Sequence, residues 1–150
     1  EIVYANRNTR RLKEQGAVEV GAGHYPVMVL LHTAWIVALF VFIPAGASID
    51  WLWMAVFAIL LALRAWTLAS IGRFWTTRII TMPGAPLVAK GPYRFIRHPN
   101  YLVVVGEIAA VPMIFGAWRL ALIFSVLNLA LLAYRIYVED KALESRRTAA

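Results

Sequence analysis

The sequence predicts an all-α membrane protein that forms a single domain with about four transmembrane helices. Of its 150 residues, 61% are hydrophobic and only 15% are charged. Soluble domains carry about 45–50% apolar and about 25% charged residues, so a soluble core of this size could not bury so many apolar side chains. Four apolar segments, and three basic regions at their ends, support the same fold class.

The first apolar segment runs from about Tyr25 to Ile43, and the second runs from Trp51 to about Ala69. Each approaches the roughly 20 helical residues that a bilayer core about 30 Å thick requires. The third segment, Tyr101 to Phe115, is short, so we expect its helix to begin earlier, near Pro99. The fourth segment, from Ala117 to about Tyr137, is long enough to span.

Gly116 separates the third and fourth segments and leaves room for only a tight turn, which predicts a helical hairpin. The chain opens with Glu1-Ile2-Val3-Tyr4, which has the composition of a helix end and is followed by a basic stretch. We therefore expect one further span upstream of Glu1.

Basic residues gather in three regions, which lie before the first segment, between the second and third, and after the fourth. They are Arg10, Arg11 and Lys13; Arg73, Arg78, Lys90, Arg94 and Arg97; and Arg135, Lys141, Arg146 and Arg147. The loop from Pro44 to Asp50 carries no Lys or Arg, and the turn near Gly116 has only Arg119. By the positive-inside rule all three regions face the cytoplasm, and we expect a bacterial inner membrane. The net charge of +7 then reflects topology and lipid headgroups, not nucleic-acid binding.

The longest polar connection runs from Gly72 to Asn100, and connections of this length are usually functional or disordered. The β-branched residues of Thr76–Thr81 favour an extended piece, and prolines and glycines mark turns after it. Its content of Pro, aromatic residues and Arg argues against disorder. We expect a folded cytoplasmic lid, with N-terminal helices in residues 1–70 and the functional half in residues 71–150.

The densest cluster of potentially reactive side chains spans Gly91 to Tyr101. Pro99 suits the first turn of a helix, and His98 would lie at the N-terminus of that helix. Free N–H groups and the helix dipole favour an anion there, such as a carboxylate. The alternative is an interfacial anchor, because Tyr, Arg and His often lie at headgroup level. The spacing leaves both interpretations open.

A second cluster lies at the cytoplasmic end of the last helix. Arg135 and Glu139 are four residues apart and share a helix face, either as a surface ion pair or as part of a site. Glu139 and Asp140 oppose the helix dipole at this end, which indicates an external partner. Glu107, inside the third segment, is either functional or paired with Arg64 or His32.

Several kinds of site are missing from the sequence. There is no cysteine, and the three histidines, at 24, 32 and 98, are too scattered to predict a metal site. No Gly-x-Gly-x-x-Gly follows a strand, and no phosphate-binding loop or Gly-x-Ser-x-Gly elbow is present. A nucleotide-like cofactor would need a site of another kind.

Three blocks together resemble the isoprenylcysteine carboxyl methyltransferase family of membrane enzymes that use S-adenosylmethionine. The blocks are Leu87-Val88-x-x-Gly91-x-Tyr93, Arg97-His98-Pro99-x-Tyr101 and Arg135-x-x-x-Glu139-Asp140-x-x-Leu143. They occur in the family's order over roughly the last half of the chain. Each block alone is weak, but the combination is fairly specific. Asp140 departs from the family, which commonly has Glu there.

The resemblance implies roles for the matching positions. The S-adenosylmethionine pocket would be lined by Leu87, Val88, Tyr93, His98, Pro99, Tyr101 and Glu139, with Ala85 and Pro86 as looser contacts because their residue types differ from the family's. Arg135 would face the carboxylate of the acceptor, and Arg135 and Glu139 would be the catalytic pair. We also assign Arg97 and Glu107 to the acceptor site. Substrate selectivity is expected in Trp75–Pro83.

The leading hypothesis is therefore O-methylation of a carboxylate or enolate on a lipophilic or prenyl acceptor, with S-adenosylhomocysteine as product. Methyl transfer from a sulfonium is an in-line displacement that needs no metal and, for a carboxylate, no base. A phospholipid N-methyltransferase is the first alternative and would need a base, such as Glu107 or His98. A sterol-type reductase that binds NADPH through Arg73, Arg78 and Arg94 is another, and a non-enzymatic membrane scaffold is the last.

Overall fold

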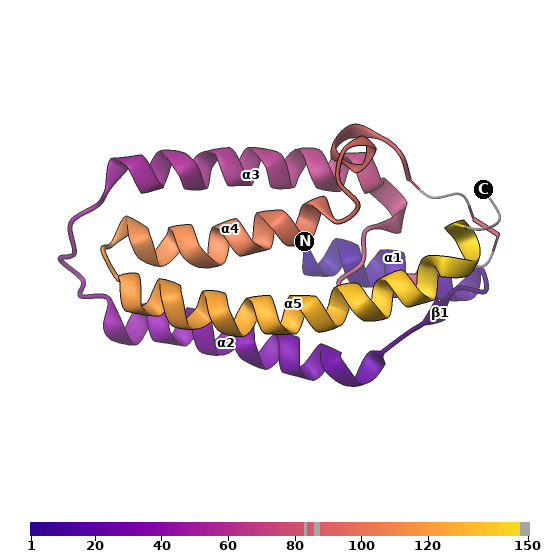
Figure 1. Ribbon diagram of the computed structural model, residues 1–150, viewed down its shortest axis with the longest axis horizontal. Helices are drawn as coiled ribbons and strands as arrows, with labels where there is room; N and C mark the ends of the chain where they lie inside the picture. Colours follow the sequence, from indigo (N-terminus) through magenta and orange to yellow (C-terminus); the bar gives the residue numbers. More distant parts are fainter. Residues whose placement is uncertain (83, 86–87, 148–150) are drawn as a thin grey trace.

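Four long helices run side by side in the computed structural model, which describes residues 1–82, 84–85 and 88–147, with side chains as far as Glu144 (Figure 1). These are α2 (Tyr25–Phe42), α3 (Trp51–Ile71), α4 (Pro99–Ile114) and α5 (Trp118–Arg147). Smaller elements gather at one end: α1 (Ile2–Glu14), strands β1 (Val18–Glu19) and β2 (Ile80–Thr81), and the 3-10 turns η1 (Ala22–His24), η2 (Gly72–Phe74) and η3 (Gly91–Arg94).

The four predicted apolar helices are confirmed, and α4 begins at Pro99 as its short apolar segment required. Within the described residues, three helical stretches are long and apolar enough to cross a membrane, Ala22–Phe42, Trp51–Phe74 and Trp118–Glu144, whereas α4 is a shorter apolar helix. Only 6% of the apolar window in each of the first two is buried by the rest of the protein. Lipid must therefore cover these surfaces, and the chain is an integral membrane protein.

The helix α4 lies at the centre, packed against both α3 and α5, while α2 packs on the other side of α5. Gly106 explains the close approach of α3, because a Cβ at this position would lie 2.7 Å from Cδ2 of Leu60. On the opposite side Ile108 packs with Ala38 of α2 and Phe124 of α5 in a buried core. The predicted hairpin is confirmed by this α4–α5 packing and by Gly116, whose φ of 67° forms the turn.

The two ends of the bundle differ in character (Figure 1). At one end lie the loop after α2 and the α4–α5 turn, joined by a hydrogen bond from the Asp50 N–H to the Ile114 carbonyl at 2.8 Å. The Asp50 side chain also caps α3 by accepting from the N–H of Leu52 at 2.9 Å. The other end, called here the loop end, gathers α1, the long connection (residues 72–98) and the last turns of α5. The three basic regions thus share one end, as predicted.

The long connection is tied to the N-terminal segment at its start. The extended piece expected in residues 76–81 is confirmed as β2, and it pairs antiparallel with β1, with Glu19 opposite Ile80. The Glu19 carboxylate accepts from Lys13 and Arg78, each at 2.6 Å. Burial alone would raise the pKa of Glu19, but these two hydrogen bonds outweigh it and hold that pKa below its usual value.

The helix α1 extends further than the sequence indicated, because the basic stretch expected to follow a helix end is itself helical as far as Glu14. Its buried Asn8 donates to the Trp75 carbonyl at 2.9 Å, so α1 supports the first part of the long connection. This part of the connection therefore has fixed partners. Its role as a lid remains a prediction.

Candidate active site

The start of α4 and the end of α5 meet at the loop end because the two helices form an antiparallel hairpin. His98 is the N-cap of α4, Pro99 occupies the first turn and Tyr101 follows it. Residues late in α5 therefore face residues early in α4, although 34 to 42 positions separate them in the sequence. In this way the fold brings together the second and third of the three blocks of the resemblance.

Tyr101 connects the acidic and the basic residue of α5. Its hydroxyl donates to Oε2 of Glu139 at 2.6 Å and accepts from Nε of Arg135 at 3.4 Å. Its ring stacks on the His98 imidazole, with centroids 5.3 Å apart and planes 17° from parallel. Arg135 and Glu139 thus belong to one network with Tyr101, in place of the simple surface ion pair.

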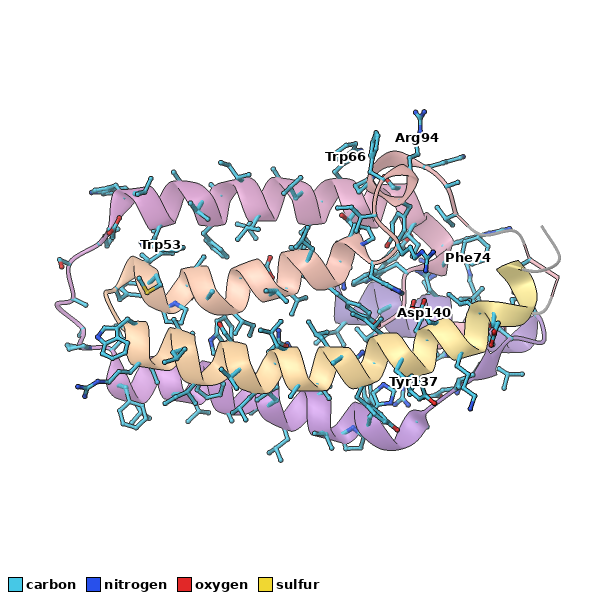
Figure 2. The ribbon with its side chains drawn as sticks, in the orientation of Figure 1. Trp53, Trp66, Phe74, Arg94, Tyr137 and Asp140 are labelled. Carbon is cyan, nitrogen blue, oxygen red and sulfur yellow. The ribbon has the colours of Figure 1, made fainter. Side chains whose placement is uncertain are left out.

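His98 lies between two carboxylates. Its Nδ1 is 3.5 Å from Oε2 of Glu139, and its Nε2 is 3.2 Å from Oδ1 of Asp140. The hydrogen bond with Glu139 raises the pKa of His98 against the opposing effect of burial, and the contact with Asp140 adds to the rise. Asp140 and Tyr137 both belong to the last turns of α5 (Figure 2), but Tyr137 is 63% exposed.

Arg135 is the buried cation of the site, with only 4% of its surface exposed. Its Nη2 donates to the Thr77 carbonyl at 3.0 Å, and its Nη1 lies 2.9 Å from the Met28 sulfur. Its guanidinium carbon is also 5.7 Å from the centre of the Tyr101 ring. All these partners are neutral, and no carboxylate in the described part of the chain lies within ion-pair distance of Arg135.

Tyr93 and Gly91 bring the connection against the helices. Burial, with a further contribution from the charge of Glu139, raises the pKa of Tyr93, which keeps its phenol protonated. Gly91 has a φ of 53° and packs on α3, where a Cβ would collide with the Ser70 hydroxyl and lie 3.0 Å from Nε1 of Trp66. Glycine at this position of the motif therefore has a steric cause.

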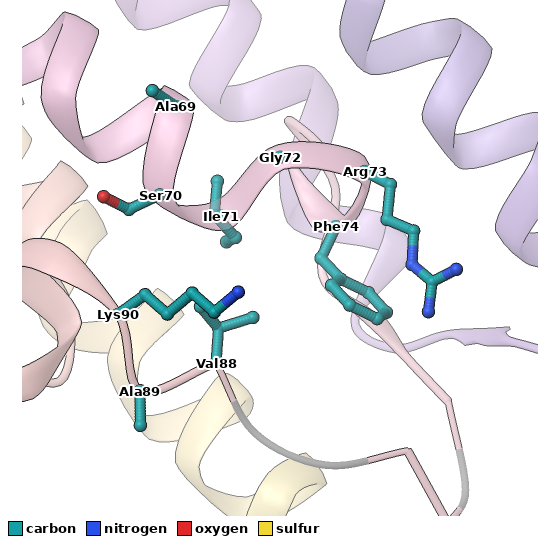
Figure 3. A pocket seen from close by; sticks show the side chains of 9 residues that line it. All are labelled: Ala69, Ser70, Ile71, Gly72, Arg73, Phe74, Val88, Ala89 and Lys90. Carbon is teal, nitrogen blue, oxygen red and sulfur yellow. The ribbon is translucent and has the colours of Figure 1, made fainter.

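Other predicted site residues belong to the long connection. Val88 lines a cavity beside the end of α3, and Ala85 is half-buried in the connection (Figure 3). Pro86 and Leu87 fall outside the described residues. Arg97 is exposed.

Glu107 pairs with Arg64 of α3, one of the two partners expected for it as the alternative to a functional role. The Nε of Arg64 donates to Oε1 of Glu107 at 2.8 Å, and Nη2 donates to Oε2. Arg64 also binds Glu1 at 2.9 Å. A role for Glu107 in acceptor binding stays a prediction, with its carboxylate already engaged by Arg64.

Sequence reasoning missed three contributors. Met28 and Thr77 hold Arg135. Met28 comes from an apolar helix without a sequence signal, and Thr77 uses its main-chain carbonyl within Trp75–Pro83, a segment expected to affect selectivity but without a named residue. Asn100 lies in the first turn of α4, and its Oδ1 is buried without a hydrogen-bond partner in the described structure. Its position inside the Arg-His-Pro-x-Tyr block was the one signal that could have found it.

Comparison with known proteins agrees with the geometry. The pattern of the isoprenylcysteine carboxyl methyltransferase (ICMT) family matches residues 51–145, which include α3, the connection, α4 and nearly all of α5. The uncharacterized protein YpbQ of Bacillus subtilis (strain 168) is 38% identical over 149 residues, covering 96% of this chain and 88% of that protein. No solved structure matches the chain. The chain belongs to the isoprenylcysteine carboxyl methyltransferase family of membrane methyltransferases.

Proposed function

We propose that the protein methylates an anionic oxygen, a carboxylate or an enolate, on a lipophilic acceptor, with S-adenosylmethionine as methyl donor. The observation that carries this proposal is Arg135, a buried cation held only by neutral groups in the described structure. Glu139 is linked to Arg135 only through the Tyr101 hydroxyl, so Arg135 is a buried charge without a direct ion pair, and an anionic acceptor would supply one. Arg135 lies near the lipid-covered helices, where an acceptor with an apolar tail can approach.

The residues beside Arg135 fit the proposed methyl donor. S-adenosylmethionine carries positive charge on its sulfur and on its amino group, and Glu139 and Asp140 provide carboxylates for such charges. The unpartnered Oδ1 of Asn100 adds a hydrogen-bond acceptor in the first turn of α4. Glu139, Tyr101 and His98 would hold the donor at its charged end, and Tyr93 and Val88 would contribute from the connection.

When bound, S-adenosylmethionine supplies an electrophilic methyl group. The protein's own contribution is to orient the acceptor and to exclude water. Arg135 would fix the anionic oxygen, and the Thr77 carbonyl and Met28 sulfur would fix Arg135. Tyr101 would keep Glu139 aligned. An acceptor that is already anionic needs no general base, so this set of residues suffices. The active site would face the cytoplasm, with the long connection as its lid.

The geometry favours this reaction over the alternatives. An amine acceptor must lose a proton, but the two candidate bases are engaged, Glu107 by Arg64 and His98 by Glu139 and Asp140. A 2′-phosphate of NADPH would need a cluster of free arginines, whereas Arg78 binds Glu19 and lies over the Tyr25 ring at 4.1 Å, which leaves only Arg73 and Arg94 of the three.

A transfer assay tests the proposal. Purified protein in nanodiscs receives S-adenosylmethionine labelled on its methyl group, together with a prenylated thioether carboxylic acid or the matching amine. Label should pass into the organic-soluble acid and not into the amine. Arg135→Gln should abolish this transfer while labelled S-adenosylmethionine still binds. Label passing only into the amine would contradict O-methylation.

A further inference from the structure

A cavity of about 660 Å³ lies at the loop end, between the end of α3 and the stretch Val88–Lys90 of the connection (Figure 3). Its size falls within the range of small-molecule sites in proteins. The lining consists of Ala69, Ser70, Ile71, Gly72, Arg73, Phe74, Val88, Ala89 and Lys90. Apart from Val88, none of these residues belongs to the site proposed for methyl transfer.

All charged residues that line the cavity are cationic. Arg73 and Lys90 are cationic, and no lining residue is acidic. Neither cation makes an ion pair within the described ranges, and the guanidinium carbon of Arg73 lies 5.0 Å from the centre of the Phe74 ring. Lys90 and Val88 point into the gap, while Arg73 lies at its margin beyond Phe74 (Figure 3). The cavity is therefore apolar with a cationic margin, which suits an amphipathic anion.

The stretch that closes the cavity also separates it from the Tyr101 network. Gly91 packs on Ser70 and Trp66 of α3. The lining residues come from the end of α3, from η2 and from the connection, and none of them belongs to α4 or α5, so the cavity lies on the α3 side of the connection. We therefore treat it as a separate site.

The surroundings of the cavity have the composition of a membrane interface. Trp66 and Arg94 project outward from α3 and η3 close to each other (Figure 2). Phe95 is 78% exposed and Ile96 is 43% exposed, and these follow Arg94 directly. Tryptophan, cations and exposed apolar side chains in one place are typical of the headgroup level of a bilayer.

We propose that this cavity binds the headgroup of an anionic phospholipid from the surrounding membrane. Lys90 and Arg73 hold the phosphate, and the acyl chains lie along the lipid-covered face of α3. The charge of the lining, the exposed apolar residues beside it and its place at the end of a spanning helix all fit this one ligand. The site goes beyond the proposed methyl transfer and does not depend on it.

The test compares nanodiscs of phosphatidylcholine with nanodiscs that also contain phosphatidylglycerol. The variants are Arg73→Gln/Lys90→Gln and, as matched control, Lys141→Gln, an exposed cation at the same end that does not line the cavity. Native mass spectrometry measures bound phosphatidylglycerol, and thermal unfolding measures the stabilisation it gives. Wild type and control should bind it equally, and the double variant should bind roughly fivefold less for each cation removed.

Equal retention by all three proteins would overturn the proposal. Equal stabilisation by inorganic phosphate in phosphatidylcholine nanodiscs would also overturn it, because the ligand would then be a free anion. Loss of S-adenosylhomocysteine affinity in the double variant, with unchanged phosphatidylglycerol retention, would assign the cavity to the methyl donor instead. The unfolding midpoint in phosphatidylcholine alone checks that the double variant is folded. If that midpoint falls below the wild-type value, the single Lys90→Gln variant is used in place of the double variant.

Discussion

The Tyr101 hydroxyl donates to Oε2 of Glu139 at 2.6 Å and so joins the first turn of α4 to the last turns of α5. Hydrogen bonds to charged groups contribute about 1.5–3 kcal/mol. Tyr101→Phe should therefore lower the free energy of unfolding by roughly that amount and weaken S-adenosylmethionine binding. Tyr137→Phe is the control, because Tyr137 belongs to the same helix and is 63% exposed. Thermal unfolding in detergent measures both, and equal midpoints for the two variants would contradict a role for this bond.

The pairing of His98 with Glu139 and Asp140 should depend on pH. The pKa of His98 is raised above its ordinary value of 6.5, so the folded state holds the proton more tightly than the unfolded state. The resulting stability is fully present below pH 6.5 and is lost as pH rises through the raised pKa. Wild type should therefore be more stable than His98→Gln at low pH, with a difference that shrinks above the raised pKa. Unfolding midpoints across this window provide the measurement, and a constant difference would argue against the charged imidazole.

Gly91 should tolerate no side chain. Gly91→Ala would meet the Ser70 side chain at a φ of 53°, so we expect a loss of about 1–3 kcal/mol in the free energy of unfolding. Gly46→Ala is the control, because nothing lies within 4 Å of the place that its new methyl group would take and its φ is not positive. Thermal unfolding of the two variants decides the point. A Gly91→Ala protein as stable as Gly46→Ala would mean that η3 does not pack on α3 as described.

Asn128 of α5 is 1% exposed, and neither atom of its amide has a hydrogen-bond partner in the described structure. An unsatisfied buried polar group costs about 1–3 kcal/mol. Asn128→Leu, which has a similar shape, should therefore raise the unfolding midpoint in detergent. A lower midpoint would show that the amide makes a contact that stabilises the bundle.

The sequence predicted the helices, and the hairpin that brings Tyr101 to Arg135 and Glu139, for identifiable reasons, while the roles of these residues stay predictions. Hydropathy determines which segments face lipid, and Pro99 marks the start of α4. The short turn at Gly116 requires an antiparallel hairpin, which brings Tyr101 to Arg135 and Glu139. The resemblance supplied the roles, and the structure supplied the contacts between these residues.

Other features had no basis in local sequence. The strand β1 has only two residues, too few for a periodic pattern, so the partner of β2 was not expected. The contact of Met28 with Arg135 joins residues 107 positions apart and depends on how α2 packs on α5. The basic stretch after Tyr4 was expected to follow a helix end, yet charged side chains on an exposed face of α1 are compatible with helix.

The most direct test of the central claim is equilibrium binding of labelled S-adenosylmethionine and labelled NADPH to the purified protein in nanodiscs, with Glu139→Gln and His98→Ala as variants. We expect that S-adenosylmethionine binds to wild type, that NADPH does not, and that both variants lose most of this affinity. Binding of NADPH without S-adenosylmethionine, or unchanged S-adenosylmethionine affinity in both variants, would contradict the claim.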